Sequence, residues 1–296
     1  MTLAPRVVLV HRRTEYDDLV ARHGSPGQAA FFLSTRGREI DEVQERHEAE
    51  AEAVRVVTAQ IPVSWRRGEV EREDLSRFLF SPEDVVVVVG QDGLVANVAK
   101  YLDAQPVIGI DPEPGRNPGV LVRHRPEDAG ALMSGAVAGA LPVEDLTMVA
   151  AEADDGQRLV ALNEIYVGHA SHQTARYRVA VPSGPEERQA SSGLVIGTGT
   201  GSTGWCSSIW RERHSALVLP GSTEPALVWF TREAWESPVT GTALTEGRLG
   251  AEPLIVTVES NRLVAFGDGI EDDHLTLSWG QQLRIGSADH PLRLVA

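Results

Sequence analysis

The sequence predicts two domains: an open α/β domain in the N-terminal part, followed by an all-β sandwich. Three observations predict this fold class. A run of five valines has the composition of a strand buried on both faces, as in a parallel sheet. A strand–helix–strand succession surrounds it. Short strands separated by turn signals make up the second half of the chain. The 296 residues also exceed the roughly 100–200 residues of one typical domain.

The elements of the first domain follow from hydrophobic patterning. Arg6–Val10 is a short β-branched run and predicts a buried strand, and Arg36–Gln60 has apolar residues at roughly helical spacing. Glu83–Gly90 contains the five valines and is the clearest strand in the chain. A helix over Leu94–Leu102 and a strand over Pro106–Ile110 complete a βαβ unit, which places an α/β domain at residues 1–125.

The second domain, residues 126–296, is predicted to be mainly a β-sandwich, with its last residues packing back on the first domain. It opens with an Ala/Gly-rich segment, Glu127–Ala140, that favours one helix. Residues 209–225 contain two prolines and a glycine and indicate a long loop. Short strands are predicted at Arg158–Leu162, Tyr177–Val181, Leu194–Ile196, Leu254–Val258 and Leu283–Ile285.

Composition and charge exclude several classes of protein. The net charge of −15 argues against non-specific nucleic-acid binding, which needs a basic surface to replace counterions. No stretch approaches the roughly 20 apolar residues of a membrane span, and the N-terminus lacks the pattern of a signal peptide. Cys206 is the only cysteine, so no internal disulfide can form. We therefore expect a cytoplasmic protein with no membrane or nucleic-acid partner.

The first candidate site is Gly90-Gln91-Asp92-Gly93, between the valine strand and a helix. In open α/β sheets ligands bind beyond the carboxyl ends of strands, where glycines and a helix N-terminus favour close approach of a phosphate. A carboxylate at Asp92 can accept a hydroxyl proton or hold Mg²⁺. A tight turn with Asp92 as a helix N-cap is the structural alternative.

The second candidate site is Asn163-Glu164, at the end of a predicted strand. Both side chains are polar and directional, so the pair can bind a ribose or the edge of a base. Taken alone, such a pair is more often a turn with a satisfied asparagine.

The third candidate site is the loop Gly197–Gly204, eight residues of only Gly, Ser and Thr after an apolar strand. Such a loop can offer backbone amides and several hydroxyls at once to a phosphate or a ribose. A flexible surface loop is the alternative, although the segment leads directly into an apparent helix. The candidate binding residues in it are Thr200, Gly201, Ser202, Thr203 and Gly204.

Two further features allow a structural explanation. Phe266–Ile270 contains an Asp-Gly pair that a β-hairpin turn explains, with a ligand role for Asp268 as the alternative. His169 and His172 lie three residues apart, but no further metal ligands are obvious nearby, so we expect solvated loop histidines and no resident metal site.

Taken together and in order, these segments resemble the NAD kinase family, which usually shows a GGDGT turn, an NE pair, a TPTGST-like loop and a late DG. The resemblance covers nearly the whole chain. It is closest to the mitochondrial-type branch and its bacterial relatives, through Val7–Tyr16, PVIGIDPEPGRNPG, ALNEIYVG and SSGLVIGTGTGST.

The resemblance implies an open, Rossmann-like nucleotide-binding domain and a β-sandwich domain that binds the dinucleotide. It implies phosphoryl transfer from ATP, or another donor, to the 2′-hydroxyl of the adenosine ribose of NAD, with Mg²⁺ on the donor phosphates. A homodimer or homotetramer is expected. Asp92 would be the catalytic base, with Gly90, Gln91 and Gly93 around it. The dinucleotide would be held by Asn163, Glu164, Thr200, Gly201, Ser202, Thr203 and Gly204.

Two departures fall in the first motif. Gln91 replaces the second glycine of GGDGT, which restricts the backbone if a positive φ is needed there. Leu94 replaces the threonine and removes a hydroxyl that would face phosphate or metal. Three hypotheses therefore stand: a working NAD kinase, a kinase for another hydroxyl compound, and a dinucleotide-binding protein with weak or no catalysis.

Overall fold

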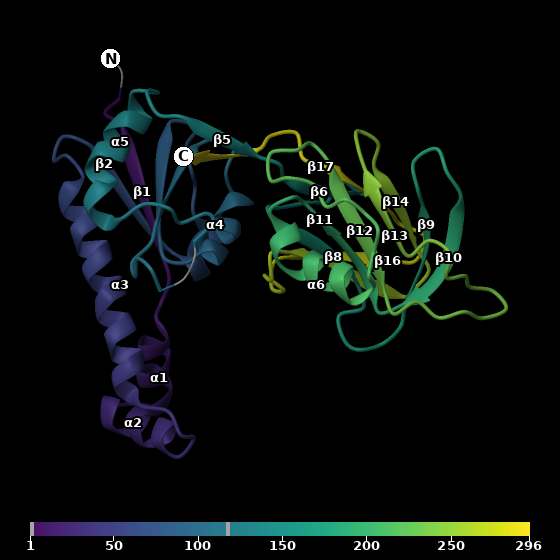
Figure 1. Ribbon diagram of the computed structural model, residues 1–296, viewed down its shortest axis with the longest axis horizontal. Coiled ribbons are helices and arrows are strands. Elements are labelled where there is room, and N and C mark those ends of the chain that lie inside the picture. The colour runs from purple at the N-terminus through teal and green to yellow at the C-terminus, as the bar shows by residue number, and fades with distance from the viewer. Residues whose placement is uncertain (1–2, 117–118) are drawn as a thin grey trace. The chain divides into compact units, whose positions relative to one another are not determined.

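The computed structural model describes residues 3–116 and 119–296, and it divides the chain into two compact units (Figure 1). The first unit comprises residues 1–144 and 293–296, and the second comprises residues 145–292. Asn117 and Pro118, which belong to the PVIGIDPEPGRNPG segment of the sequence resemblance, lie outside the described residues. The division differs from the boundary predicted at residue 125, because residues 126–144 pack with the first unit.

The first unit is an open α/β domain around a six-stranded sheet in the order β2-β1-β3-β4-β18-β5. In this sheet β1 pairs with β2 and with β3, β3 pairs with β4, and β4 pairs with β18, each time in parallel. Its elements are β1 (Arg6–His11), α1 (Glu15–His23), α2 (Pro26–Ser34), α3 (Ile40–Gln60), β2 (Arg66–Glu71), η1 (Arg72–Arg77), β3 (Asp84–Val89), α4 (Asp92–Ala99), β4 (Pro106–Ile110), η2 (Pro126–Asp128), α5 (Ala129–Val137), β5 (Val143–Leu146) and β18 (Leu292–Val295).

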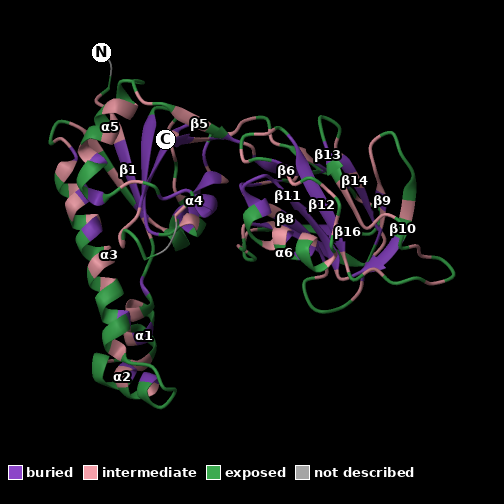
Figure 2. Cartoon of the chain, in the orientation of Figure 1, coloured by how far each residue is buried: buried purple, intermediate pink, exposed green. Residues whose placement is uncertain are grey.

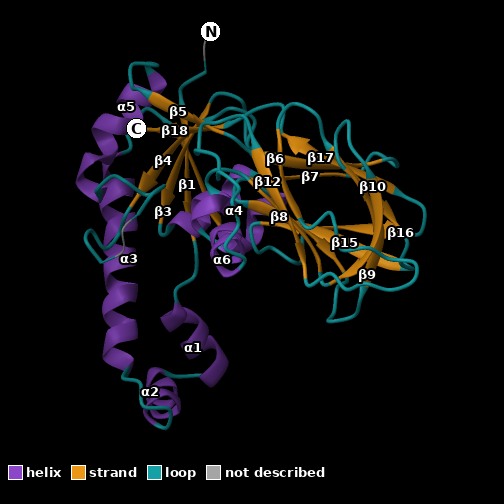
Figure 3. Ribbon diagram, turned by 45° about the vertical axis from the view of Figure 1, so that its right-hand side comes forward, coloured by secondary structure: helices purple, strands orange, loops and turns teal. Residues whose placement is uncertain are grey.

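The helices cover the two faces of this sheet, with α3 and α5 on one face and α4 on the other (Figure 3). Every residue of β3 is buried, as its continuous valine run requires. Ala129 and Met133 of α5 lie in one apolar cluster with Ile108 and Ile110 of β4. This packing explains why the helix predicted after residue 125 belongs to the first unit.

The long helix α3 contributes to two cores. Its C-terminal half buries Ala53 and Val57 against the sheet, whereas Val43 in its N-terminal half packs on α1 and α2. The N-terminal half extends beyond the sheet and is mostly exposed (Figure 2). Two short helices that the patterning did not predict, α1 and α2, therefore form a small apolar cluster with it.

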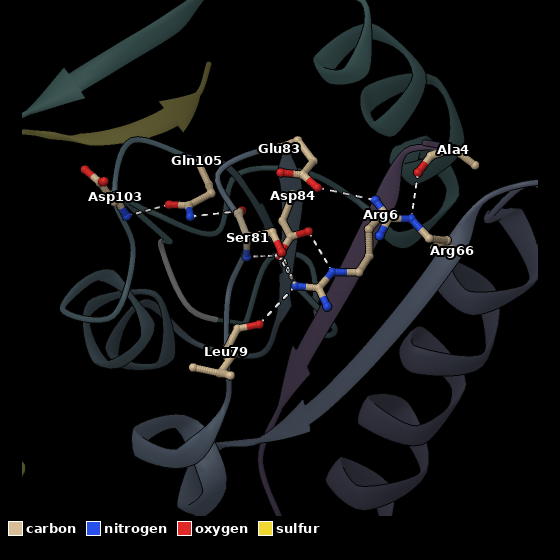
Figure 4. A network of polar contacts seen from close by, with 9 residues as sticks. All are labelled: Ala4, Arg6, Arg66, Leu79, Ser81, Glu83, Asp84, Asp103 and Gln105. Carbon is tan, nitrogen blue, oxygen red and sulfur yellow. Dashed lines mark hydrogen bonds and ion pairs between the residues drawn. The ribbon is translucent and has the colours of Figure 1, made fainter. Parts of the chain in front are cut away.

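A polar network fixes the edge of the sheet where its strands begin (Figure 4). The Arg6 guanidinium donates to both carboxylate oxygens of the fully buried Asp84, with 2.7 Å from Nε to Oδ1, and to the carbonyl of Leu79 at 3.0 Å. The backbone N–H of Ser81 also donates to Asp84, at 2.7 Å. A buried carboxylate needs such partners, so the network holds β1 against β3 at the edge away from the GQDG turn.

The second unit is a β-sandwich of two six-stranded sheets, with orders β10-β9-β14-β17-β6-β7 and β13-β12-β11-β8-β15-β16. Neighbouring strands in both sheets are antiparallel. Its elements are β6 (Val149–Ala153), β7 (Arg158–Ala161), β8 (Glu164–Gly168), β9 (Ala175–Ala180), β10 (Glu186–Ser191), β11 (Gly193–Gly197), η3 (Gly201–Thr203), α6 (Trp205–Glu212), β12 (Leu227–Arg232), β13 (Glu246–Leu249), β14 (Leu254–Val258), β15 (Arg262–Gly267), β16 (His274–Ser278) and β17 (Gln282–Ser287).

The sandwich core contains inward-facing residues of both sheets, such as Ile165 and Val167 of β8 and Val256 of β14. On the opposite face of its sheet, β8 carries Glu164 and Tyr166, which leaves that face to α6. The predicted fold class, an open α/β domain followed by an all-β sandwich, is confirmed. The last strand also returns to the first unit, since β18 pairs with β4.

Candidate functional site

The GQDG turn connects β3 to α4 in the first unit. Gly90 has φ +155° and donates its backbone N–H to the carbonyl of Ile110 at 3.1 Å. Gln91 is the N-cap residue of α4, with φ −105° and ψ 164°, which is extended backbone that any residue adopts. The departure at Gln91 therefore imposes no strain, and Asp92 is the first helical residue rather than the N-cap.

The carboxylate of Asp92 binds the loop that follows β4. Its Oδ2 accepts the backbone N–H of Val120 at 2.9 Å, and its Oδ1 accepts those of Leu121 at 2.9 Å and Val122 at 3.0 Å. A carboxylate offers about four lone-pair sites, so three are used by described residues and one on Oδ2 is left. Asp92 thus has a structural function and capacity for one further donor.

Gly109 lies beside this loop, where two backbone segments pack too closely for a side chain. A Cβ added to Gly109 would lie 2.1 Å from the carbonyl oxygen of Leu121, so the loop can cross β4 only where no side chain stands. Leu94, the other departure, is buried and packs over Gly90, where an added Cβ would lie 3.1 Å from its Cδ2. Its side chain therefore fills core space, and the threonine usual in GGDGT would leave that space partly empty.

In the second unit, Asn163 and Glu164 lie where β7 gives way to β8, and Asp268 holds this turn. The Asp268 carboxylate accepts the backbone N–H of Leu162 at 2.8 Å and that of Asn163 at 2.7 Å. Its own N–H donates to the carbonyl of Glu164 at 3.2 Å. Asp268 stands in the loop of the β15–β16 hairpin, so the hairpin interpretation of the FGDG segment is confirmed, and the carboxylate has this organising contact in addition.

The Gly/Ser/Thr loop supports the same turn from the other side. Thr198 donates its hydroxyl to the carbonyl of Leu162 at 2.6 Å and its N–H to that of Asn163 at 2.9 Å. A Cβ added to Gly201 would lie 2.1 Å from the Asn163 carbonyl oxygen. The structure therefore brings three sequence-predicted segments together in the second unit: the NE pair, the Gly/Ser/Thr loop and the late DG.

The loop is a buried turn that leads into α6, not a flexible surface segment. The hydroxyls of Ser202 and Thr203 both donate to backbone carbonyls within the loop, at 2.9 Å each. The hydroxyl of Thr200 is buried and has no hydrogen-bond partner among the described residues. The expectation of several exposed hydroxyls differs from this arrangement, in which Thr203 and Gly204 are the exposed positions.

The side chains of Asn163 and Glu164 are half-buried, and neither makes a hydrogen bond or ion pair with the residues that the structure describes. Burial and the nearby Asp268 carboxylate raise the pKa of Glu164 to about 7. Burial, together with Glu164, raises the pKa of the neighbouring Cys206 thiol to about 12, which makes it a poor nucleophile. The site therefore presents two uncommitted polar side chains on a fixed backbone.

An aromatic recess of about 430 Å³, lined by Tyr166 among others, lies on the face of the sheet that carries Glu164. Tyr166, two residues beyond Glu164, stacks on Trp205 with ring centroids 6.0 Å apart and meets Phe266 at 5.0 Å. The guanidinium of Arg232 lies 5.2 Å from the Trp205 ring centroid. Planar aromatic groups can stack in such a recess. The sequence reasoning missed it, because its residues Tyr166, Trp205, Phe266 and Arg232 come from four separate elements.

Neither a membrane span nor a clear metal centre is found in the part of the chain that the structure describes. None of its helices is long and apolar enough to cross a membrane. Across residues 3–116 and 119–296, no group of three or more His, Cys, Asp or Glu side chains has the arrangement to hold a metal ion. His169 accepts a hydrogen bond from the backbone N–H of Ser171 at 3.1 Å.

The comparisons with known proteins point in one direction. No family model matches the chain. The human protein "NAD kinase 2, mitochondrial" is 28% identical over 266 residues, covering 72% of this chain and 59% of its own length. The "NAD kinase" of Psychrobacter arcticus is 28% identical over 163 residues, covering 52% of this chain and 49% of its own. The chain thus spans about half to three-fifths of the lengths of these curated relatives.

Solved structures share the fold across almost the whole chain. An NAD kinase from Archaeoglobus fulgidus in complex with ATP aligns with a TM-score of 0.57 at 18% identity, covering 98% of this chain and 93% of that one. Yeast NADH kinase complexed with NADH aligns with a TM-score of 0.62 at 12% identity, covering 100% and 84%. The chain is therefore similar to the NAD kinases in sequence and in fold, and to the mitochondrial-type members among them in sequence.

Proposed function

We propose that this protein is an NAD kinase, which transfers a phosphoryl group from ATP, or another phosphate donor, to the 2′-hydroxyl of the adenosine ribose of NAD. The observation that carries the proposal is the Asn163–Glu164 pair: two polar side chains without partners among the described residues, on a backbone that Asp268 and Thr198 hold fixed. Ribose hydroxyls need directional donors and acceptors held in place, which this pair offers.

The aromatic recess supports a dinucleotide as the ligand. Tyr166, Trp205 and Phe266 would contact one planar ring system of the dinucleotide, since stacking on aromatic side chains tolerates any base. Glu164, with its pKa near neutrality, would donate or accept a hydrogen bond at a ribose hydroxyl. Thr203 and Gly204, the exposed end of the Gly/Ser/Thr loop, would contact the linking phosphates through backbone amides.

Asp92 is the proposed base, and its geometry limits how it acts. Because both carboxylate oxygens already accept backbone N–H groups, the remaining position on Oδ2 is where a substrate hydroxyl would donate. Gly90 and Gly93 leave the backbone open to a phosphate at the α4 N-terminus. Mg²⁺ would arrive bound to ATP, with carboxylates of the chain supplying at most part of its coordination.

Three further elements of the proposal rest on the sequence. A homodimer or homotetramer is proposed from the family resemblance. A cytoplasmic location is proposed from the single, unpaired cysteine. The small-molecule partners are proposed to be NAD and ATP.

The test is direct. The purified chain is incubated with ATP, Mg²⁺ and NAD, and NADP is quantified with a dehydrogenase that accepts only NADP. NADP formation by the wild type, with at least a 10-fold higher KM for NAD in Asn163→Ala, supports the proposal. An exposed carboxamide, Gln282 of β17, supplies the matched control Gln282→Ala, which should behave as wild type. No NADP from a folded protein, with any donor tried, would overturn it.

A second candidate is a dinucleotide-binding protein with weak or no catalysis. The observation that favours it is the commitment of Asp92 to three backbone N–H groups, which suits a structural carboxylate as well as a base. NAD binding by calorimetry, weakened in Asn163→Ala, together with no phosphorylation of NAD or of other alcohols, would select this candidate. A kinase for a different hydroxyl compound would instead consume ATP with that compound alone.

A further inference from the structure

The β-sandwich carries a second, polar groove on the sheet that contains β9, β10 and β14. Two adjoining recesses, of about 530 Å³ and about 400 Å³, share Arg176, Glu259 and Trp279 in their walls. Because these three residues line both, the recesses form one continuous groove. His169 and Arg262 stand at one end of it, and Trp235 stands at the other.

Two tryptophans stand exposed on the groove. The side chain of Trp279 is 63% exposed and that of Trp235 is 43% exposed. Their backbones are fixed: the N–H of Trp235 donates to the carbonyl of Ala190 at 3.1 Å, and the N–H of Gly280 donates to that of Val258 at 2.9 Å. Large aromatic side chains held on a fixed backbone, with faces open to solvent, are typical of ligand or partner contacts.

The charges of the groove are arranged for an anion. Glu259 is neutralised by Arg188, whose Nη2 donates to it at 3.0 Å, and by Arg178, whose Nε lies 3.2 Å from it. The guanidinium groups of Arg176 and Arg262 make no hydrogen bond or ion pair within residues 3–116 and 119–296. Arg262 also lines a recess with Glu271 and Asp272, so the charge of the groove is counted without it. In a chain of net charge −15, Arg176 and Arg188 against Glu259 still leave the groove locally positive.

The groove lies away from the Asn163–Glu164 pair. Glu164 begins β8, whereas His169 follows the end of that strand. In the partner strand β15, Gly267 stands beside the pair and Arg262 is at the other end. A strand rises about 3.3 Å per residue, so about 15 Å of sheet separates the groove from the pair.

We propose that this groove is a second ligand site that binds a nucleotide, with the base stacked on the exposed indoles and the phosphates held by Arg176. Stacking of a base on an aromatic side chain adds to affinity and tolerates any base. A guanidinium fork matches phosphate oxygens in pairs. His169 and Arg262 also line the aromatic recess of the proposed dinucleotide site, whereas Arg176, Trp235 and Trp279 do not. The assignment therefore rests on these last three residues and not on the proposed kinase activity.

The test measures ATP binding to the full chain by calorimetry. The variant Arg176→Gln should lose one binding equivalent, or bind it at least 10-fold more weakly, and Trp279→Ala should weaken the same equivalent. Arg284, on the same sheet but outside the groove, provides the matched control Arg284→Gln, which should bind as wild type. Thermal unfolding confirms that each variant is folded, since surface substitutions of this kind change stability little.

Three outcomes would overturn the assignment. The first is an unchanged ATP stoichiometry and affinity in Arg176→Gln. The second is pyrophosphate alone binding the groove as tightly as ATP, which would make it an anion site without a base. The third is a fall in the sedimentation mass of Trp279→Ala relative to wild type, which would make the surface an interface between copies. Adenosine and pyrophosphate each binding at least 10-fold more weakly than ATP would support a nucleotide.

Discussion

The two Asp-Gly turns of this molecule make the same kind of contact but position different groups. In each, an aspartate carboxylate accepts backbone N–H groups from a segment remote in sequence: Asp92 from residues 120–122, and Asp268 from residues 162–163. Asp92 opens a helix after an extended residue. Asp268 has φ +53°, in the left-handed region, and precedes Gly269 at φ +69°.

The difference lies in what each turn positions. The first turn holds a loop, and the aspartate itself is the polar group that is left able to meet a ligand. The second holds the backbone of Asn163 and Glu164, whose side chains are the groups able to meet one. The comparison shows that the same Asp-Gly motif can supply a reacting group in one domain and can hold other groups in place in the second.

The largest expected effect distinguishes the role of Asp92 from that of Asp268. An amide cannot accept at both of its ends, so Asp92→Asn and Asp268→Asn should each leave a backbone N–H unpaired and lower the free energy of unfolding by about 1–3 kcal/mol. If Asp92 is the base, its variant should also lose about 100-fold or more in kcat with KM for NAD nearly unchanged. Asp268→Asn should mainly raise KM for NAD. Steady-state kinetics and urea unfolding measure both.

Asp41 supplies the matched control for this pair, because it lies in the first turn of α3, as Asp92 lies in that of α4, and is exposed. Asp41→Asn should change neither kinetics nor stability by more than a few tenths of a kcal/mol. Asp92→Asn and Asp268→Asn could instead lose kcat equally, in proportion to their losses of stability. That result would show that the two aspartates do not differ in role.

Glycines beside the two turns give the next largest effect. A Cβ at Gly109 or at Gly201 would lie 2.1 Å from a backbone oxygen, so alanine there should cost about 3 kcal/mol or more. Gly93 has nothing within 4 Å of an added Cβ, so Gly93→Ala should stabilise α4 by about 1 kcal/mol. The same variant should weaken ATP binding if a phosphate approaches this backbone. Chemical unfolding measures the stability of Gly93→Ala, and calorimetry measures its ATP binding. Unimpaired ATP binding would show that the donor phosphates bind at another place.

A pH dependence should distinguish the second turn from the first. The ordinary pKa of Glu164 is 4.5, and burial raises it to about 7 in the folded chain. Between these values the folded chain holds a proton that the unfolded chain has lost. This contribution to stability is therefore fully present below pH 4.5, falls as the pH rises through 7, and amounts to up to about 3 kcal/mol.

Urea unfolding at pH 5 and pH 8 measures this contribution. The loss of stability between the two pH values should be smaller in Glu164→Gln than in wild type, because the amide cannot ionise. The same loss in both proteins would show that the carboxyl titrates near its ordinary pKa.

The smallest effect is expected at Gln91, one of the two departures in the first motif. Because Gln91 has an extended backbone and makes no side-chain cap, Gln91→Gly should change kcat by less than about 3-fold and stability by about 0.5 kcal/mol or less. Leu94→Thr should instead destabilise the fold by about 1–3 kcal/mol, since it empties buried space. A large gain in kcat from Gln91→Gly would mean that this glutamine obstructs the donor.

Apolar runs made much of the fold predictable. The strands Pro106–Ile110 and Leu254–Val258 have the bounds that the sequence indicated, because each is a short run of residues with strong β preference. The strand β2, with sequence RRGEVE, was not predicted, since it is charged and stands at the edge of its sheet. The helices α1 and α2 were missed because their apolar faces are short and pack only on each other and on α3.

The candidate site was predictable in its members but not in its contacts. Asp92, Asn163 and Glu164 stand out because polar residues follow apolar strands there. The function of Asp268 as the support of the NE turn depends on partners about 105 residues away, which no local pattern contains. The φ value of Gln91 likewise decides whether the departure matters, and spacing alone does not give it.

The contacts of the Asp92 and Asp268 carboxylates with backbone N–H groups form two carboxylate clamps. One consequence is that hydrogen exchange of these amides can report on each clamp. The amides of Val120, Leu121 and Val122, and those of Leu162 and Asn163, lie in turns and loops, where exchange with solvent is usually fast. Each is nevertheless bound to an aspartate. Their exchange rates therefore record how often each clamp opens, one domain at a time. A nucleotide that engages one clamp alone would slow only the amides of that domain.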